Sequence, residues 1–249
     1  MLFVAAAIFA ALLYMLAISL FSFPSLGIAG DVLTAALAIL FPYAVTKYKP
    51  LQMPVLGIGK APKKEHLPLL WLLPLFVAVI FGTSLVCNWV GSFFGATSPT
   101  YTGKLLALLF SHALIPALIE EFCFRHVCFS ILSPLGEKSA IFATTLLFAI
   151  AHISPVSMAY ALVAGLLLGA LRAYTGSLAL PILFHFANNA FCLILIQINP
   201  SSPLPAWGIC TGVGLLCLGI LYFTKGQTLL SFCRFFTHNP TPKEEIADE

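Results

Sequence analysis

Four ionisable side chains occur within eight residues of an otherwise apolar stretch, the sequence IEEFCFRH at 119–126. Glu121 and Arg125 are four residues apart with the acid first, which is the favourable order for an ion pair on one face of a helix. Glu120 is rotated by about 100° from Glu121 around the helix axis, so its carboxylate points elsewhere. We therefore predict that Glu121 and Arg125 form a supporting ion pair and that Glu120 is available for proton transfer.

Two other apolar segments carry histidine. His152 ends the sequence FAIAH, and His185 lies four residues before Asn189 in the sequence HFANN. A carboxylate and an imidazole can hold and deprotonate a water molecule, and a second imidazole with a carboxamide can donate hydrogen bonds to a developing oxyanion. Together with Glu120, these groups suit hydrolysis of an amide bond by activated water. The chain contains no Gly-x-Ser-x-Gly sequence, and no serine or cysteine nucleophile stands out.

A metal site is an alternative use of the same residues. One Glu and two His form a known catalytic zinc set, but the chain lacks the sequence His-Glu-x-x-His that is typical of such sites. We therefore favour hydrolysis that requires no cofactor and retain Zn²⁺ as the alternative, with the metal ligands left open.

Membrane-spanning helices must position these residues. The 249 residues are 60% hydrophobic and 8% charged, with a mean hydropathy of +1.02. Because about 20 apolar residues cross a bilayer as a helix, we predict an all-α, polytopic membrane helix bundle in the cell membrane. The eight expected spans are 2–22, 28–46, 67–94, 105–133, 139–155, 157–173, 178–198 and 206–224. The first lacks a basic segment before its apolar run, so we expect a retained span rather than a signal peptide.

The distribution of Lys and Arg predicts the orientation, because cytoplasmic loops carry an excess of these residues. With the N-terminus in the cytoplasm, the outer face receives Lys104 alone. The inner face receives Lys47, Lys49, Lys60, Lys63, Lys64, Lys138, Arg172, Lys225, Arg234 and Lys243. We therefore expect cytoplasmic N and C termini and a single membrane-embedded domain over 1–224. A polar cytoplasmic tail follows over 225–249, and its end, PTPKEEIADE, has a composition typical of disorder.

Several other classes gain no support from the sequence. A formal net charge of +3 without a dense basic block gives no indication of nucleic-acid binding. The seven cysteines contain no C-x-x-C pair, so a disulfide framework is not expected. No internal repeat suggests an inverted-repeat transporter. Gly165 and Gly169 form a G-x-x-x-G pattern, which predicts close helix packing.

The three polar motifs, in this order on separate helices, resemble those of the CPBP family. The motifs are EEFCFR (E-E-x-x-x-R), FAIAH (F-x-x-x-H) and HFANN (H-x-x-x-N), and the segment TGSLALPILFHFANNAF is also similar to the family's third motif region. The family comprises CAAX prenyl endopeptidases of the Rce1 type and bacterial Abi proteins, including bacteriocin-immunity members. The resemblance covers about 105–200.

The resemblance implies an eight-helix intramembrane endopeptidase whose site is reached from the cytoplasm. By motif position, Glu120 is the water-activating base and His152 assists it. His185 and Asn189 are implied to stabilise the oxyanion, and Phe148 fits a packing role. Expected partners are the lipid bilayer and a membrane-associated peptide or protein substrate, prenylated or not; the oligomeric state is open.

Two alternatives remain at this stage. A non-catalytic bacteriocin-immunity or partner-binding membrane protein could use the same scaffold, and its activity would survive loss of Glu120. A proton-coupled transporter could use intramembrane Glu and His as a proton relay, and it would show solute flux without proteolysis.

Overall fold

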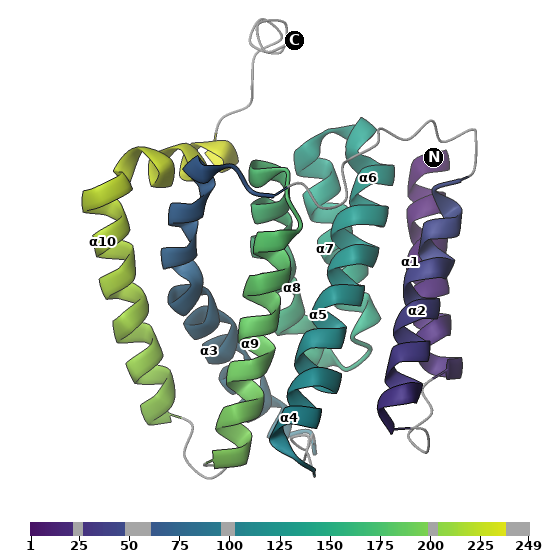
Figure 1. Ribbon diagram of the computed structural model, residues 1–249, viewed down its shortest axis with the longest axis horizontal. Helices are drawn as coiled ribbons and strands as arrows, with labels where there is room; N and C mark the ends of the chain where they lie inside the picture. Colours follow the sequence, from purple (N-terminus) through teal and green to yellow (C-terminus); the bar gives the residue numbers. More distant parts are fainter. Residues whose placement is uncertain (22–26, 48–60, 96–102, 199–203, 238–249) are drawn as a thin grey trace, which may run out of the picture.

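The helices expected from the sequence are present in a computed structural model of the protein, which describes residues 1–21, 27–47, 61–95, 103–198 and 204–237. The fold is all-α, with eight helical rods in one bundle and no strand within those ranges (Figure 1). The rods are α1 (Leu2–Phe21), α2 (Gly27–Val45), η3 (Lys64–Leu72) continuing into α3 (Leu73–Ser92), a long rod from α4 to η6 (Leu105–Leu135), α7 (Glu137–Ala151), α8 (Pro155–Thr175), α9 (Ala179–Ile198) and α10 (Leu204–Thr237).

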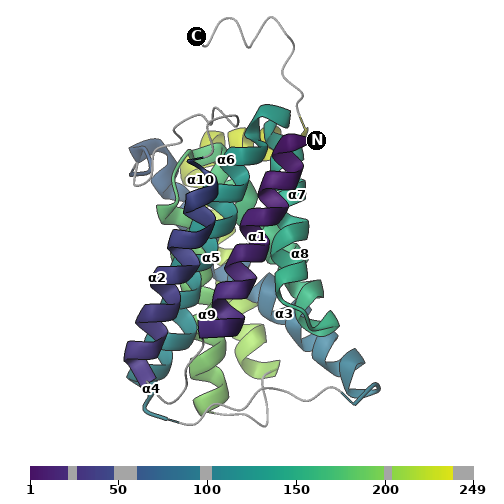
Figure 2. The ribbon, with the colours of Figure 1, turned by 90° about the vertical axis from the view of Figure 1, so that its right-hand side faces the viewer.

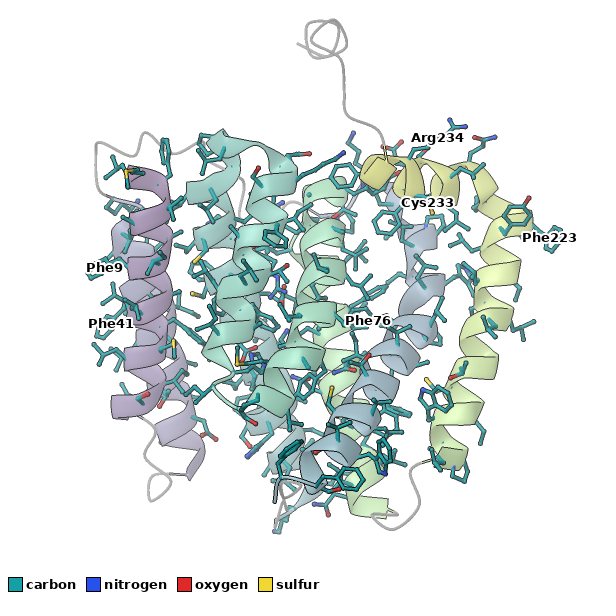
Figure 3. All side chains as sticks on the ribbon, turned by 180° about the vertical axis from the view of Figure 1, so that it is seen from behind. Phe9, Phe41, Phe76, Phe223, Cys233 and Arg234 are labelled. Carbon is teal, nitrogen blue, oxygen red and sulfur yellow. The ribbon has the colours of Figure 1, made fainter. Side chains whose placement is uncertain are left out.

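The composition of these rods is that of a multi-pass membrane protein. Among the described residues, six segments are long and apolar enough to cross a membrane, namely Leu2–Ser19, Lys64–Ser92, Leu105–Leu135, Pro155–Thr175, Ala179–Gln197 and Leu204–Phe235. A shorter apolar helix covers Ala29–Val45, and α7 has 15 residues, about 22 Å of helix. Figure 3 shows Phe9 and Phe223 at opposite edges of the bundle, where they are 55% and 85% exposed. Large apolar side chains thus face outward, as a lipid environment allows.

The rod over 105–135 corresponds to the expected fourth span, but it is not a regular α-helix. Its consecutive parts are α4 (Leu105–Leu108), η4 (Leu109–Leu114), α5 (Ile115–Glu120), η5 (Glu121–Cys128), α6 (Phe129–Leu132) and η6 (Ser133–Leu135). The segments η4 and η5 are π-helical. Pro116 follows η4 closely and has no backbone N–H for the α-helical hydrogen bond. Such π-helical turns are frequent at functional sites, and η5 begins at Glu121.

Small residues let α7 and α8 pack closely, as the G-x-x-x-G pattern predicts. A Cβ added at Gly165 would lie 2.9 Å from Cγ2 of Thr145. A Cβ added at Gly169 would lie 3.2 Å from Cγ2 of Ile141. Because protein interiors are close-packed, a larger side chain at either position would push the two helices apart.

The start of α1 and the end of α10 lie at the same end of the bundle (Figure 1). Figure 2 shows α1 and α2 side by side along one edge, and they are in direct contact. An even number of rods brings the chain back to the end where it started. The assignment of that end to the cytoplasm stays a prediction.

The last helix differs from the expected one, because α10 does not stop at residue 224. Lys225 has non-helical backbone angles (φ −139°, ψ 39°), and beyond this kink the helix turns across the end of the bundle (Figure 1). Figure 3 shows Arg234 on this final segment. Phe232 and Phe235 pack against Tyr174 at ring-centroid distances of 5.2 and 5.9 Å. The first part of the expected tail is therefore a docked helix, and PTPKEEIADE lies outside the described residues.

Candidate active site

Glu121 and Arg125 form a buried ion pair in η5. Arg125 Nη1 donates a hydrogen bond to Glu121 Oε1 at 2.9 Å, and neither side chain is exposed. Arg125 Nη2 also donates to the carbonyl oxygen of Gly165 at 3.3 Å. The guanidinium carbon lies 4.2 Å from the centre of the Phe148 ring, which is close enough for a cation–π contact. A buried charge requires such partners, so this pair ties η5 to α7 and α8.

His185 of α9 binds to the same carboxylate. Its Nδ1 lies 2.8 Å from Glu121 Oε1. An ionised carboxylate can only accept a hydrogen bond, so Nδ1 is the donor. The other ring nitrogen, Nε2, lies 3.7 Å from Oε2 of Glu120. His185 therefore stands between the two adjacent carboxylates, hydrogen-bonded to one and facing the other.

Glu120 has a different environment from Glu121, because its side chain remains 15% exposed. Its Oε1 accepts a hydrogen bond from the hydroxyl of Tyr14 at 3.2 Å. Its Oε2 makes no hydrogen bond within the described part of the chain and faces His185 Nε2. One oxygen of this carboxylate is thus held in place, and the other is directed toward a second titratable group.

His152 lies where α7 ends. Its Nδ1 is 2.8 Å from the carbonyl oxygen of Phe148, and a carbonyl only accepts, so Nδ1 is again the donor. In the neutral ring this leaves Nε2 as the nitrogen that can accept a proton. The ring packs edge-on against Phe148 at 4.7 Å between centroids. The backbone carbonyl and the aromatic ring together fix the orientation of His152.

Phe148 is the packing centre of these groups. It is 2% exposed. Besides Arg125 and His152, it contacts His185 at a centroid distance of 5.9 Å and Phe124 at 5.3 Å. These contacts agree with the packing role that the F-x-x-x-H motif implies.

A cavity of ≈ 160 Å³ brings Glu120 and His152 together. Its lining residues are Tyr14, Met15, Ile18, Ser19, Glu120, Phe124, Ala151, His152 and Ile153. A buried water needs roughly 10–15 Å³ on this measure and two to four polar partners, so the cavity has room for several water molecules. Ile153, in the turn between α7 and α8, is 72% exposed. This turn and the last turns of α1, which also line the cavity, lie away from the end where α1 starts, so entry from the end that carries the termini stays a prediction.

Asn189 lies one helical turn after His185 on α9 and is half-buried. Its Oδ1 accepts a hydrogen bond from Asn188 Nδ2 at 3.4 Å. Within the described residues it makes no hydrogen bond to the other predicted site residues. The structure thus joins Glu120, Glu121, Arg125 and His185 in one cluster, places His152 on the shared cavity, and leaves Asn189 next to the cluster.

Sequence analysis did not identify Tyr14 as a site residue. Its hydroxyl contacts Glu120, 106 residues away in the sequence. The available signal was weak: Tyr14 and Ser19 are the only hydroxyl-bearing residues in α1, and a tyrosine in an apolar helix usually needs no further explanation.

The donor set does not fit a three-ligand metal site. Within the described ranges, no group of three or more His, Cys, Asp or Glu side chains could hold a metal ion. We therefore derive no step through Zn²⁺.

Residues 102–191 match the family model described as type II CAAX prenyl endopeptidase Rce1-like. The matched segment runs from the start of the long rod into α9 and contains Glu120, Glu121, Arg125, His152, His185 and Asn189. Tyr14 lies outside it. No curated protein and no solved structure gives a significant match. The match confirms the family resemblance that the three motifs indicated.

Proposed function

We propose that this protein is an intramembrane endopeptidase that cleaves membrane-associated substrates with water activated by Glu120 and His152. The match of residues 102–191 to the Rce1-like CAAX prenyl endopeptidase model supports the proposal. The observation that carries the proposal is the shared cavity, because a carboxylate from α5 and an imidazole from the end of α7 both line it and it has room for water. The substrates are peptides or proteins held at the bilayer, prenylated or not.

The separate bonding of the two carboxylates supports the assignment of roles. Glu121 is saturated on Oε1 by Arg125 and His185 and is fully buried. Each carboxylate has a buried Oε2 without a hydrogen bond among the described residues, but Glu120 is 15% exposed and borders the cavity, whereas Glu121 is not among the lining residues. A general base must reach the proton that it removes, and Glu120 is the carboxylate with such access.

In the first step, a water in the cavity donates one hydrogen bond to Glu120 and one to Nε2 of His152. With both protons held by acceptors, the oxygen lone pair is directed at the carbonyl carbon of the substrate. Glu120 takes the proton as the C–O bond forms, and the carbonyl oxygen becomes an oxyanion. Positioned base catalysis of this kind contributes typically 100-fold to 10,000-fold in rate.

In the second step, the C–N bond breaks as the proton on Glu120 passes to the leaving nitrogen. Asn189 supplies an amide donor for the oxyanion, and His185 supplies a second donor from Nε2 when its ring carries both protons. Glu121 and Arg125 hold His185 and η5 in position throughout. The substrate carbonyl must then lie between the cavity and α9.

We also propose that both termini are cytoplasmic. Within the described residues, Lys47 follows α2, Lys138 lies at the start of α7, and Lys225 lies at the kink of α10. These element ends lie at the end of the bundle where α1 starts (Figure 1), whereas Lys104 precedes α4 at the opposite end. The excess of positive charge at one end is typical of a cytoplasmic face.

The test uses purified full-length protein in lipid nanodiscs. Wild type, Glu120→Gln and His152→Ala are incubated with a panel of prenylated and unmodified peptides, and products are identified by mass spectrometry. Glu65→Gln is the matched control, because it removes a carboxylate that is 65% exposed and whose ion-pair partners among the described residues are Lys63 and His66. We expect cleavage by wild type and Glu65→Gln and a loss of at least about 100-fold in the two site variants.

Three results would contradict this function. Full cleavage by Glu120→Gln would remove the proposed base. Solute or proton flux in proteoliposomes without cleavage of any peptide would favour the transporter, and a binding or protective activity that survives Glu120→Gln would favour the non-catalytic alternative. A parallel series with a chelator tests the metal: we expect unchanged cleavage, and abolished cleavage restored by Zn²⁺ would require a metal-dependent mechanism.

A further inference from the structure

We propose that Tyr14 of α1 is a positioning residue that orients the carboxylate of Glu120 for catalysis. This inference rests on the proposed function, in which Glu120 is the base. It assigns to α1, which lies outside the family-matched residues 102–191, a direct contact with the reacting group.

The contact is a single buried hydrogen bond. The Tyr14 hydroxyl donates to Glu120 Oε1 at 3.2 Å, and Tyr14 is only 6% exposed. Its ring packs edge-on against Phe124 with centroids 5.3 Å apart, so the phenol has little freedom to move. Among the described residues, Tyr14 is the one hydrogen-bond donor to Glu120. The orientation of this carboxylate therefore depends on α1.

The packing of α1 fixes the height of Tyr14 relative to the long rod. One face of α1 is buried and consists of small residues around the tyrosine: Ala7, Ala10, Ala11 and Ala17 are 0–5% exposed. Small residues allow close approach of helices in a membrane. Two turns away from Tyr14, Cys128 Sγ lies 3.6 Å from the carbonyl oxygen of Ala7. Because α1 and the long rod run antiparallel, the Tyr14–Glu120 and Ala7–Cys128 contacts are compatible with the same alignment of the two helices along their axes.

The two carboxylate oxygens of Glu120 have different neighbours. Oε1 accepts from Tyr14, so Oε2 is the oxygen that faces His185 Nε2 at 3.7 Å. Tyr14 also lines the cavity, so the phenol lies beside the proposed water. A hydroxyl that donates to Oε1 stops rotation of the carboxylate and holds Glu120 beside the cavity, while Oε2 is buried and faces His185.

The test compares Tyr14→Phe with Tyr43→Phe in nanodiscs. Tyr43 on α2 is half-buried, and its ring contacts Lys47 and Phe122, so its variant removes one phenolic hydroxyl away from the cavity. We expect Tyr14→Phe to lower kcat by roughly 10-fold to 100-fold, because misplacement of a reacting group has effects of this size. KM should stay within about twofold, since binding is not removed. Tyr43→Phe should match wild type.

A double variant shows whether Tyr14 acts through Glu120. In the Glu120→Gln background, Tyr14→Phe should cause no further loss of residual activity, because groups that work as one unit are not additive. An equal loss in both backgrounds, or a wild-type kcat in Tyr14→Phe, would overturn the inference while leaving the proposed function intact. Wild-type protein without any cleavage would overturn the proposed function and the catalytic role of Tyr14 together.

A second readout does not need catalysis. The melting temperatures of wild type, Tyr14→Phe, Glu120→Ala and the double variant form a cycle. We expect the decreases in melting temperature of the two single variants to add up to more than the decrease in the double variant, since each single change removes the same hydrogen bond. Additive losses would contradict the contact itself, whatever the activity of the protein.

Discussion

The π-helical segment η5 and the residue before it have two contrasting sides. On one side, Glu121 and Arg125 are completely buried and bonded to one another, to His185 and to α8. On the other side, Glu120 is 15% exposed and lines a cavity with Tyr14 and His152. The two acids are adjacent in the sequence, yet one is enclosed by protein partners and the other reaches space for water.

This difference indicates how a membrane helix can hold a partly exposed carboxylate. A charge within a bilayer is costly and needs a partner or a polar cavity. The side with Glu121 and Arg125, here called the ionic side, provides the partners and fixes the helices. The side with Glu120, Tyr14 and His152, here called the cavity side, provides the space. We therefore expect substitutions on the ionic side to lower stability first and substitutions on the cavity side to lower activity first.

The largest effect should follow from breaking the ionic side. Arg125→Met leaves Glu121 buried without its cation, and removal of one partner of a buried ion pair typically costs about 3–5 kcal/mol. We expect a large drop in melting temperature, measured by differential scanning fluorimetry in detergent. The double variant Glu121→Leu/Arg125→Met should lose less stability than Arg125→Met, because it leaves no unpaired charge in this pair. A melting temperature of Arg125→Met equal to that of wild type would contradict the structural role.

The cavity side should respond in the opposite way. His152→Ala removes the imidazole that lines the cavity and is held by one backbone hydrogen bond. We expect kcat to fall by about 100-fold or more, with a melting temperature within a few degrees of wild type. Steady-state cleavage measures the expected fall in kcat, and thermal melting of the same preparation measures the expected stability. Large destabilisation with retained kcat would show that His152 belongs to the structural side.

A smaller effect should follow from moving α8 away from the ionic side. Gly165→Ala places a Cβ against Thr145, while the Gly165 carbonyl accepts a hydrogen bond from Arg125. Overpacking of this kind costs typically about 1–3 kcal/mol. Gly219→Ala is the matched control, because a Cβ at Gly219 meets nothing within 4 Å. Equal melting temperatures for the two variants would argue against close packing of α7 and α8.

The smallest effect should come from an exposed ion pair. Lys63 and Glu65 lie 3.5 Å apart, with side chains 76% and 65% exposed. Pairs of this kind contribute typically less than about 1 kcal/mol, so Glu65→Gln should barely change the melting temperature. A loss comparable to that of Arg125→Met would mean that burial does not explain the strength of the Glu121–Arg125 pair.

Much of the fold follows from the sequence, because apolar length predicts membrane helices independently of how they pack. The eight rods lie close to the expected ranges, and the i, i+4 spacing predicts the ion pair of Glu121 and Arg125. The π-helical geometry of η4 and η5 was not predicted, because it depends on packing around the rod. The continuation of α10 beyond Lys225 was missed because polar residues there resemble a tail, whereas Phe232 and Phe235 hold it against the bundle.

The site was only partly predictable for the same reason. Motif order indicated Glu120, His152 and His185, and local spacing separated the two acids. The hydrogen bond from His185 to Glu121 joins residues 64 positions apart, and that from Tyr14 to Glu120 joins residues 106 positions apart. No periodicity within one helix contains such pairs, so they appear only when the helices are assembled.

The central claim is tested most directly by measuring peptide cleavage and melting temperature for Glu120→Gln and Glu121→Gln side by side in nanodiscs. We predict that Glu120→Gln melts close to wild type and loses cleavage, whereas Glu121→Gln melts far below wild type. A Glu120→Gln protein that cleaves at the wild-type rate, or a Glu121→Gln protein with unchanged stability, would contradict the division of labour between the two acids.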